Sequence, residues 1–532
     1  MALPLVSVPN DVSASGHEQR SPRAARCADS GLANDAKAPF PPGPPGVPLL
    51  GNTLAIDAEK PYETFEAWTR EYGDLVYCRL FGQDTLVVGS ESVARDLLER
   101  RSSNFSDKTM LGAAELLGLD RLSAFVPHTD HWRLHRRVFH QAIRQDAVAR
   151  YRPAQLRAAH ELCRNIFLAP RAYVEHLTLH AGAIILATVY GYDVSGRHDD
   201  AMLAIIERAN EHVTGNGTPF VFAIFEAFPS LARIPKWLGP VGSLARLAHD
   251  SNKYVSDMVE VPFVWVRKTM SEGYTTVTSS MVSDSLRKFG DEDGAVDIET
   301  EKAIKGSAAA AFTAGTETTF AVIQIFILAM IRRPDVQRRL HAQLDAAVGS
   351  GSDGRLPTFE DRPQLPLLDA VLRETLRWRP VVPVNLPHGV SEDDVYEGCF
   401  IPGGADVIVN THAILHDSVL YPSPDTFNPD RFLDPSSGAL DDTSAAWRRV
   451  SLAFGLGRRV CPGRHLAEGS IWAAMASLLA VFEFGPPRDE HGKEVEFDVK
   501  WTSGMVRRPL PFPCEIKPRY AGVLEKIEAE LM

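Results

Sequence analysis

One long helical pattern constrains the fold of this chain more than any other feature. Residues 298–332 have helical spacing, are apolar over much of the surface that such a helix would present, and end just before Pro334. A helix of this length spans about 50 Å, because each residue adds about 1.5 Å. A helix that is apolar on most sides is buried. We therefore expect residues 298–332 to cross the centre of a large, α-rich domain.

Two further signals set the organisation of the chain. Residues 1–38 are rich in Ala, Ser, Asp and Arg without periodicity, which predicts a disordered segment. Residues 41–48 read PPGPPGVP, and we expect a stiff strap there because proline fixes φ and removes a hydrogen-bond donor. No internal repeat is evident, and residues 39–532 are predicted to form a single domain.

Short β signals lie on both sides of the helical region. Strand-like runs occupy residues 75–80 and 85–88 and are separated by Gly82, and further β-like pieces lie within residues 390–409. Most of the chain between these regions has helical patterns. We therefore expect a mostly α-helical domain with small β-sheets and the long helix at its centre.

Bulk properties exclude several classes of protein. The formal net charge is −12, whereas a general nucleic-acid binder needs a basic face. The six cysteines are scattered without close pairs, which is typical of neither a disulfide framework nor a zinc site. The opening MALPLVSVPN is too short and too broken by proline for a secretory signal, and no run of about eighteen uncharged apolar residues is present. We expect an intracellular protein without a transmembrane anchor.

One cysteine stands in an unusual setting. It lies in the segment Phe454-Gly-Leu-Gly457-Arg-Arg459-Val-Cys461-Pro-Gly463, just before a helical run at residues 464–482. A thiolate in an apolar pocket needs backbone N–H groups aimed at its sulfur, and glycines allow that close approach. Taken alone, a buried structural cysteine would be the simpler interpretation. Five specified residues at fixed offsets match by chance only about once in ten thousand, so the pattern favours a metal-binding thiolate.

This segment resembles the haem-binding loop of the cytochrome P450 family. The resemblance implies a mostly α-helical cytochrome P450 fold with the long helix over a b-type haem (iron protoporphyrin IX), and Cys461 as the axial ligand of the haem iron. It also implies that Arg459 pairs with a haem propionate, that Phe454 shields the sulfur from water and that Gly463 brings the backbone close to it. The similarity extends over residues 41–519.

Three more residues match family positions that contact the haem propionates. Trp132 and Arg136 lie one helical turn apart in the run Trp-Arg-Leu-His-Arg. The alternative is an ordinary basic helix face, which would also suit the docking of an acidic electron donor. His388, in Leu-Pro-His-Gly, matches a third position, although a lone histidine is more often a satisfied core or surface residue.

The long helix carries an acid–alcohol pair, Glu317 and Thr318, directly after Ala314-Gly-Thr. A threonine in mid-helix can bond back to the carbonyl four residues earlier and distort the helix, which opens a groove for water. The alternative is a solvated glutamate beside a packed threonine. The family resemblance implies that this pair delivers protons during oxygen activation.

A glutamate and two arginines match a structural triad of the family. Glu374 and Arg377 are three residues apart and share a helix face, which by itself is typical of a surface salt bridge. The family pair is buried and joined by an arginine from the loop before the cysteine, here Arg431. Such a buried triad is costly to break, because any lone member is left uncompensated. We expect it to hold the haem pocket rather than to take part in chemistry.

The predicted substrate pocket is apolar. The positions that match pocket positions of the family are Phe125, Val126, Ala310, Ala311, Ala314, Val381, Val382, Val384 and Met505. This lining implies a hydrophobic substrate such as a terpenoid, fatty acyl or polyketide-like compound. The aromatic segments 219–228 and 234–238 match the substrate entrance, which in the family can touch a membrane; the alternative is ordinary core helix.

The sequence therefore predicts a haem-thiolate monooxygenase that inserts one oxygen atom of O2 into a hydrophobic small molecule. No flavin or nicotinamide domain is recognised, so electrons would come from NADPH through a separate flavoprotein reductase. The microsomal resemblance implies the surface of the endoplasmic reticulum membrane, and no nucleic-acid partner is expected. Two alternatives stay open: a haem-thiolate isomerase, dehydratase or peroxygenase that needs no reductase, and a non-catalytic haem-binding protein.

Overall fold

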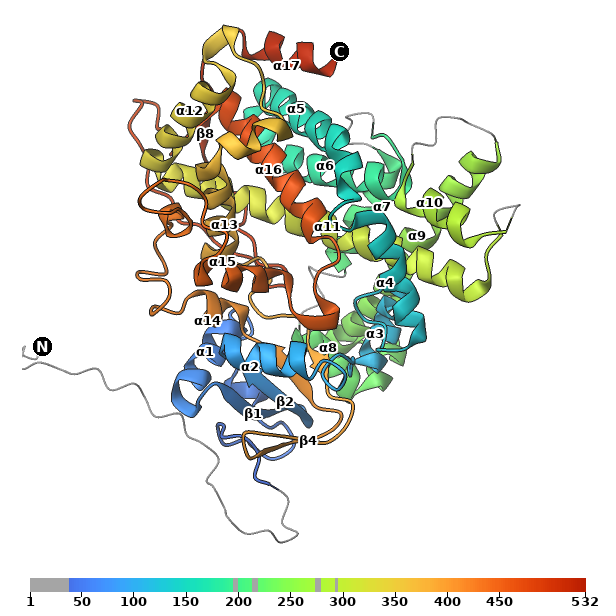
Figure 1. Ribbon diagram of the computed structural model, residues 1–532. Helices are drawn as coiled ribbons and strands as arrows, with labels where there is room; N and C mark the ends of the chain where they lie inside the picture. Colours follow the sequence, from blue (N-terminus) through green and yellow to red (C-terminus); the bar gives the residue numbers. More distant parts are fainter. Residues whose placement is uncertain (1–37, 195–199, 213–218, 273–278, 292–294) are drawn as a thin grey trace, which may run out of the picture.

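Helices dominate the architecture, as predicted (Figure 1). The computed structural model describes residues 38–532 except 195–199, 213–218, 273–278 and 292–294, so the predicted disordered segment lies outside the described residues apart from its last position. The α-helices are α1 Pro61–Tyr72, α2 Glu91–Arg95, α3 Leu111–Leu117, α4 Asp130–Ile143, α5 Arg152–Leu168, α6 Tyr173–Ile185, α7 Ala201–Asn210, α8 Pro219–Ala227, α9 Gly239–Ser271, α10 Met281–Phe289, α11 Ile298–Arg332, α12 Pro334–Val348, α13 Pro366–Trp378, α14 Thr411–Leu415, α15 Ala445–Val450, α16 Arg464–Val481 and α17 Val523–Leu531.

Small sheets complete the fold. The strands are β1 Leu75–Leu80, β2 Gln83–Val88, β3 His388–Gly389, β4 Asp394–Tyr396, β5 Cys399–Ile401, β6 Asp406–Val409, β7 Phe482–Gly485 and β8 Glu515–Pro518. One sheet has the order β1-β2-β6-β3, in which β2 and β6 are parallel, and β4–β5 and β7–β8 form separate antiparallel pairs. The sheet at β1 and β2 and the strand β8 lie at opposite ends of the molecule (Figure 1).

The first hairpin follows its sequence signal closely. β1 has the predicted bounds, and β2 begins at Gln83, two residues earlier than predicted. Phe81 and Gly82 both have positive φ, 48° and 86°, as a two-residue hairpin turn requires. The glycine adopts this conformation without strain, which explains the break between the two strand-like runs.

The proline-rich strap lies against β1. The backbone N–H of Tyr77 donates to the carbonyl of Pro42 at 3.0 Å, and the Asn52 side chain donates to the carbonyl of Pro44 at 3.0 Å. Phe40 stacks on the Tyr77 ring with 4.4 Å between ring centroids. A Cβ at Gly43 would overlap the Tyr77 carbonyl, so this position needs glycine. The strap is therefore fastened to the body by backbone bonds.

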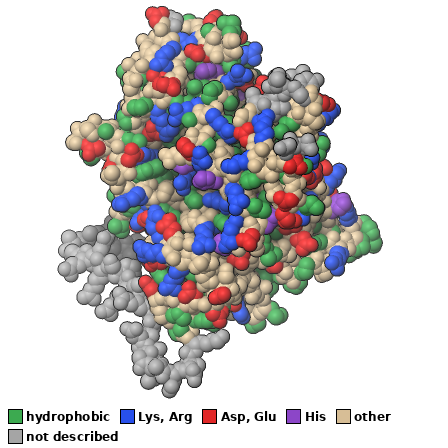
Figure 2. Space-filling view, turned by 45° about the vertical axis from the view of Figure 1, so that its right-hand side comes forward, with side chains coloured by type: hydrophobic (Ala, Val, Ile, Leu, Met, Phe, Trp, Pro, Cys, Tyr) green, Lys and Arg blue, Asp and Glu red, His purple; other side chains and the backbone are tan. Residues whose placement is uncertain are grey.

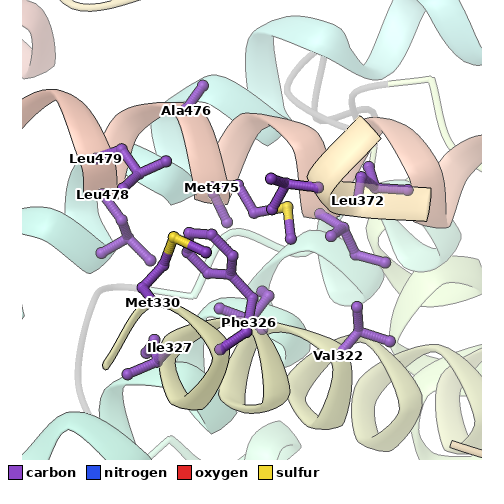
Figure 3. Close-up of a cluster of buried hydrophobic side chains, with 14 of the residues drawn as sticks. Val322, Phe326, Ile327, Met330, Leu372, Met475, Ala476, Leu478 and Leu479 are labelled. Atoms are coloured by element: carbon purple, nitrogen blue, oxygen red, sulfur yellow. The ribbon is translucent and has the colours of Figure 1, made fainter. Parts of the chain in front are cut away.

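The helix α11 is the centre of the molecule, as its sequence pattern predicts. It begins where the Asp297 side chain accepts a hydrogen bond from the backbone of Thr300, and it ends before Pro334. Its C-terminal half packs in the main hydrophobic core. Figure 3 shows side chains of this half meeting those of α13 and α16; the labelled residues are Val322, Phe326, Ile327, Met330, Leu372, Met475, Ala476, Leu478 and Leu479.

Two helical stretches among the described residues are long and apolar enough to cross a membrane by length and composition alone. They are Pro170–Tyr190 and Ile298–Arg332, and their most apolar windows are 67% and 78% buried inside the protein. Such burial is typical of core helices.

The structure contains a disulfide-bonded cysteine that the spacing of cysteines in the sequence does not predict. Cys78, Cys163, Cys461 and Cys514 are free thiols, whereas Cys399 on β5 is disulfide-bonded. A disulfide depends on the distance between two cysteines in space, which scattered positions in the sequence do not reveal.

Candidate haem-thiolate site

The cysteine loop closes on itself. The backbone N–H of Cys461 donates to the carbonyl of Phe454 at 2.7 Å, and the backbone N–H of Gly463 is bonded to the Cys461 thiol. Burial raises the pKa of the Cys461 thiol, while the N–H of Gly463 and the charge of Arg136 act in the opposite direction. The loop therefore presents one thiol with backbone and cationic support, and α16 begins directly after it.

Two of the three glycines in the loop, Gly457 and Gly463, have different surroundings. Gly463 lies beside the sulfur, with 3.9 Å between its ideal Cβ position and Cys461 Sγ. Gly457 has a φ of 60°, and a Cβ there would overlap the carbonyl oxygen of Leu98. Gly457 therefore lets the loop dock closely onto the helical turn Asp96–Arg100.

Helix α4 brings Trp132 and Arg136 to the cysteine loop. The Arg136 guanidinium donates to the carbonyl of Val460, the residue before the cysteine, at 2.9 Å. The buried Trp132 ring lies 4.6 Å from the guanidinium carbon of Arg459 and 5.8 Å from that of Arg136. One aromatic ring thus packs against two cations from different parts of the chain.

Arg459 is held rigidly by backbone carbonyls. Its Nε donates to the carbonyl of Ser106 and its Nη2 to that of Val126, both at 2.8 Å. Its Nη1 is buried and makes no hydrogen bond within the described part of the chain. Burial lowers the pKa of Arg459 to about 10, so it remains charged.

His388 and Lys108 complete this cluster. His388, on β3, contacts the carbonyl of Phe105 through Nδ1 at 2.9 Å, and burial lowers its pKa to about 3, which keeps it neutral. The ammonium of Lys108 donates to the carbonyl of Pro387 at 2.6 Å. Burial, followed by the charge of Arg459, lowers the pKa of Lys108 to about 7. Sequence reasoning missed Lys108 because a single lysine in a loop carries no local signal.

The charge balance of this cluster fits haem. Lys108, Arg136 and Arg459 form no ion pair with any carboxylate that the structure describes, and each donates to backbone carbonyls instead. Buried cations without counter-ions are unfavourable. A ligand with carboxylates on one edge, as the haem propionates are, supplies the missing negative charge, and the buried Nη1 of Arg459 is a donor available to it.

One face of α11 is more exposed to solvent than the rest of this helix. Ala314 is exposed, and Ala310 and Thr318 are half-buried, whereas most residues from Ala303 to Ile331 are buried. These three positions are spaced by four residues and lie on one face. The hydroxyl of Thr318 donates to the carbonyl of Ala314 at 2.6 Å, which is the predicted back-bond. The half-buried Glu317 stands next to it.

The back-bond of Thr318 does not interrupt α11. The helix is continuous from Ile298 to Arg332. Gly315 faces α6, where a Cβ would lie 2.5 Å from Ile185 Cδ1. This glycine therefore leaves room for the Ile185 side chain of α6 against α11.

Glu374, Arg377 and Arg431 come together in the interior. Arg377 donates to both oxygens of Glu374 at 2.7 and 2.8 Å, and both side chains are fully buried. The Nε of Arg431 lies 3.6 Å from Glu374 Oε1. Arg377 also donates to the carbonyls of Leu415 and Pro424, which ties α13 to the loop that precedes the cysteine. The bidentate bond favours the ionised form of Glu374.

The predicted pocket positions are only partly exposed. Val126 and Val381 are buried, and the remaining seven are half-buried or, at Ala314, exposed. The Phe125 ring stacks on Phe222 of α8, with ring centroids 5.7 Å apart and planes within 7°. The backbone N–H of Arg507 donates to the carbonyl of Val381 at 2.7 Å, which links two of the predicted pocket segments.

The apolar entrance segment divides into two parts. Phe222 and Phe225 on α8 are buried in the core. Phe228, Trp237 and Leu238, after α8, are 52%, 81% and 46% exposed. The described part of α8 therefore packs as an ordinary core helix. The exposed aromatic surface belongs to the segment that follows α8.

Comparisons with known proteins agree with this site. Residues 41–513 match the family model described as Cytochrome P450. The chain is 33% identical to cytochrome P450 monooxygenase COX1 of Coprinopsis cinerea, over 92% of this chain and 93% of that protein. It is 35% identical to cytochrome P450 monooxygenase 98 of Postia placenta, over 91% of each chain. It is 34% identical to tryptamine 4-monooxygenase of Psilocybe cyanescens, over 92% and 94%.

This chain belongs to the cytochrome P450 family. It is thus a haem-binding oxidoreductase of the oxygen-incorporating monooxygenase class.

Proposed function

We propose that this enzyme oxidises a hydrophobic small molecule with O2, using electrons from NADPH delivered by a separate flavoprotein reductase. The observation that carries the proposal is a group of three half-buried basic side chains, Lys108, Arg136 and Arg459, which lie beside the Cys461 loop and form no ion pair with a carboxylate that the structure describes. This arrangement suits a dianionic, flat cofactor whose metal is reached by the thiolate.

Each residue of the cluster would have its own role in holding the haem. Cys461 would bind the haem iron through its thiolate, and Lys108, Arg136, Arg459 and His388 would hold the propionates. Trp132 fixes the two arginines through its ring. When bound, the haem supplies the iron at which O2 is activated, and a thiolate ligand favours O–O cleavage.

Thr318 and Glu317 are the proposed proton-handling pair. The Thr318 proton is donated to Ala314, so its oxygen lone pairs remain available to accept a hydrogen bond from water. The half-buried Glu317 beside it can exchange protons with solvent. This geometry supports two roles: the Thr318 hydroxyl orients a water molecule, and the Glu317 carboxylate replaces the proton that this water gives up.

The face of α11 supports a hydrophobic substrate. Ala310, Ala311 and Ala314 offer small apolar side chains next to Thr318, and Phe125 contributes an aromatic wall. Terpenoid, fatty acyl and polyketide-like compounds fit this lining. Because one relative is named for tryptamine, indole amines belong in the substrate screen as well.

The surface supports a protein donor and a membrane contact. Arg133, Arg137 and Arg144 are exposed on or just after α4, the helix that reaches the cysteine loop, and suit an acidic reductase. Figure 2 shows basic and acidic side chains interspersed over one face, without the broad basic surface of a nucleic-acid binder. The exposed Phe228, Trp237 and Leu238 support peripheral contact with the endoplasmic reticulum membrane.

Reconstituted turnover tests this function. Holoenzyme, a fungal NADPH-dependent flavoprotein reductase and a panel of hydrophobic compounds and indole amines are combined, and O2, NADPH and product are measured together. We expect at least one compound to shift the haem spectrum and to give product that depends on both O2 and NADPH. Product formation without O2 would support an isomerase or dehydratase instead, and product formation from peroxide alone would support a peroxygenase.

A further inference from the structure

Histidines spaced by four residues occur three times in the described chain. The pairs are His131 and His135 on α4, His176 and His180 on α6, and His412 and His416 at α14. This spacing places two imidazoles on one helix face and is a common arrangement for metal binding. The three pairs share this spacing, so they can be compared by the arrangement of their ring nitrogens.

Two of the three pairs direct ring nitrogens to backbone carbonyls. His176 Nε2 contacts the carbonyl of Ala169 at 3.1 Å, and His180 Nδ1 contacts that of Ala158 at 3.0 Å. His416 Nδ1 contacts the carbonyl of His412 at 3.0 Å, and the two rings stack in parallel at 12° with centroids 4.0 Å apart. Neither pair presents convergent nitrogens.

The pair on α4 is arranged differently. His131 Nε2 and His135 Nε2 lie 3.1 Å apart, and the rings meet edge to face at 80°. His131 Nδ1 lies 3.3 Å from the Glu299 carboxylate in the first turn of α11. In one assignment of the protons, His135 Nε2–H donates to His131 Nε2 and His131 Nδ1–H faces Glu299. His135 Nδ1 is then a buried acceptor without a hydrogen-bond partner among the described residues.

We propose that His131 and His135 form a second metal site, which takes Zn2+ or another late first-row transition ion once the shared proton has moved from His135 Nε2 to His135 Nδ1, so that both Nε2 atoms are free to coordinate. With metal–nitrogen distances of about 2.0–2.1 Å, nitrogens at this separation subtend an angle of about 100° at the ion, close to tetrahedral. A carboxylate bonded to the far nitrogen of a ligating histidine is the usual support of such ligands, and the Glu299 carboxylate lies 3.3 Å from that nitrogen, within ion-pair distance but without a hydrogen bond.

The surroundings of the pair suit this ion. The His131 side chain is 30% exposed, which gives the ion a route from solvent. Gly306 of α11 makes room for the His135 ring, because a Cβ there would lie 2.7 Å from His135 Cε1. No third protein ligand is present among the described residues, so waters would complete the coordination and the ion would exchange.

The two histidines adjoin the proposed haem-supporting residues along the chain. His131 precedes Trp132, and His135 precedes Arg136. An ion bound to both histidines would join two successive turns of the helix that carries the propionate contacts. Its binding can be measured by a signal that does not depend on turnover.

The test is calorimetric titration of Zn2+ into holoenzyme that carries no polyhistidine tag. We compare wild type with His131→Gln, in which the amide can still bond to His135 but cannot chelate with it. The matched control is His140→Gln, an exposed histidine of the same helix. We expect one Zn2+ per chain in wild type and in the control, and at least tenfold weaker binding in His131→Gln.

Glu299→Gln keeps the test decisive if the first variant loses haem. Its side chain is 58% exposed, so the fold should tolerate the change. Removing the carboxylate behind a ligating histidine typically weakens metal binding about 10- to 100-fold, and we expect a loss in that range. Absence of Zn2+ binding in wild type, or equal affinity in wild type, His131→Gln and Glu299→Gln, would overturn the proposal.

Discussion

The Glu374 carboxylate stands at the centre of the interior polar contacts. Arg377 donates to both its oxygens, the backbone of Asn428 donates to it at 2.8 Å, and Arg431 lies nearby. Glu374→Ala should lower the free energy of unfolding by about 3–5 kcal/mol, because it leaves a buried guanidinium uncompensated. The same change should reduce the haem content of the purified protein.

Urea unfolding and the haem-to-protein ratio check this expectation. Asp130→Asn is the control, since it removes an exposed partner of Arg133, and such surface pairs contribute about 0–1 kcal/mol. A Glu374→Ala protein as stable and as haem-rich as this control would contradict the proposed role of the triad.

The proposed role of Thr318 can be tested by comparison with Thr316, a nearby threonine that makes the same type of hydrogen bond to the helix backbone. Thr318 and Thr316 both donate to the carbonyl four residues earlier, at 2.6 and 2.9 Å, but Thr316 is buried away from the exposed face of α11. Thr318→Ala should lower product per O2 consumed by about tenfold or more, because proton delivery is impaired. Thr316→Ala should leave this ratio near wild type. Equal coupling in both variants would count against the assignment.

At the scale of elements, the long helix was predictable because its signal is local. Its apolar spacing, its N-cap and Pro334 all lie within one stretch of sequence, and the observed bounds of α11 agree with them. The role of Gly315 was not predictable in this way. It depends on Ile185, more than a hundred residues earlier, and only the packing of α6 on α11 shows it.

The contact between α3 and α8 is a second tertiary feature without a sequence signal. The Glu226 carboxylate on α8 accepts a hydrogen bond from the backbone N–H of Ala113 at 2.8 Å, and it lies against Gly112. Helix α3 has no cap from its own side chains, so this bond fastens its first turn to α8.

Glu226→Ala should loosen α3. We expect faster amide hydrogen exchange over residues 111–117, because an N-terminal N–H loses its acceptor, and faster binding of spectral-shift ligands if α3 bounds the entrance. Glu115→Ala, on the exposed side of the same helix, is the control. Exchange as slow in Glu226→Ala as in wild type would show that the carboxylate does not hold this helix.

At the scale of the whole molecule, buried neutral histidines set the response to acid. Burial lowers the pKa of both His160 and His180 to about 4, and both side chains are almost fully buried. Unfolded histidine binds a proton below about pH 6.5, so between pH 6.5 and 4 the unfolded chain takes up protons that the folded protein does not. Stability should therefore fall with acidification in this window, by about 1.4 kcal/mol per pH unit for each histidine.

Urea unfolding at several pH values between 4.5 and 7.5 measures this slope. The double variant His160→Gln and His180→Gln should show a shallower dependence on pH than wild type. An unchanged slope in the double variant would mean that other groups dominate the acid response.

The candidate site was predictable where its residues lie in one short motif. The Cys461 loop, Thr318 with its back-bond, and the Glu374–Arg377 pair could be recognised from local spacing. Lys108 could not, because its position beside Arg459 results from a loop that folds back over a long sequence distance. The charge balance that supports haem binding is likewise a property of the assembled molecule.

The most direct test of the central claim is the spectrum of the reduced protein with carbon monoxide. Wild-type holoenzyme should show the red-shifted Soret band of a thiolate-ligated haem, and Cys461→Ser should lack that band while Cys514→Ser, a change at another free thiol, should retain it. Absence of the band in wild type, or its persistence in Cys461→Ser, would contradict the assignment of Cys461 as the axial ligand.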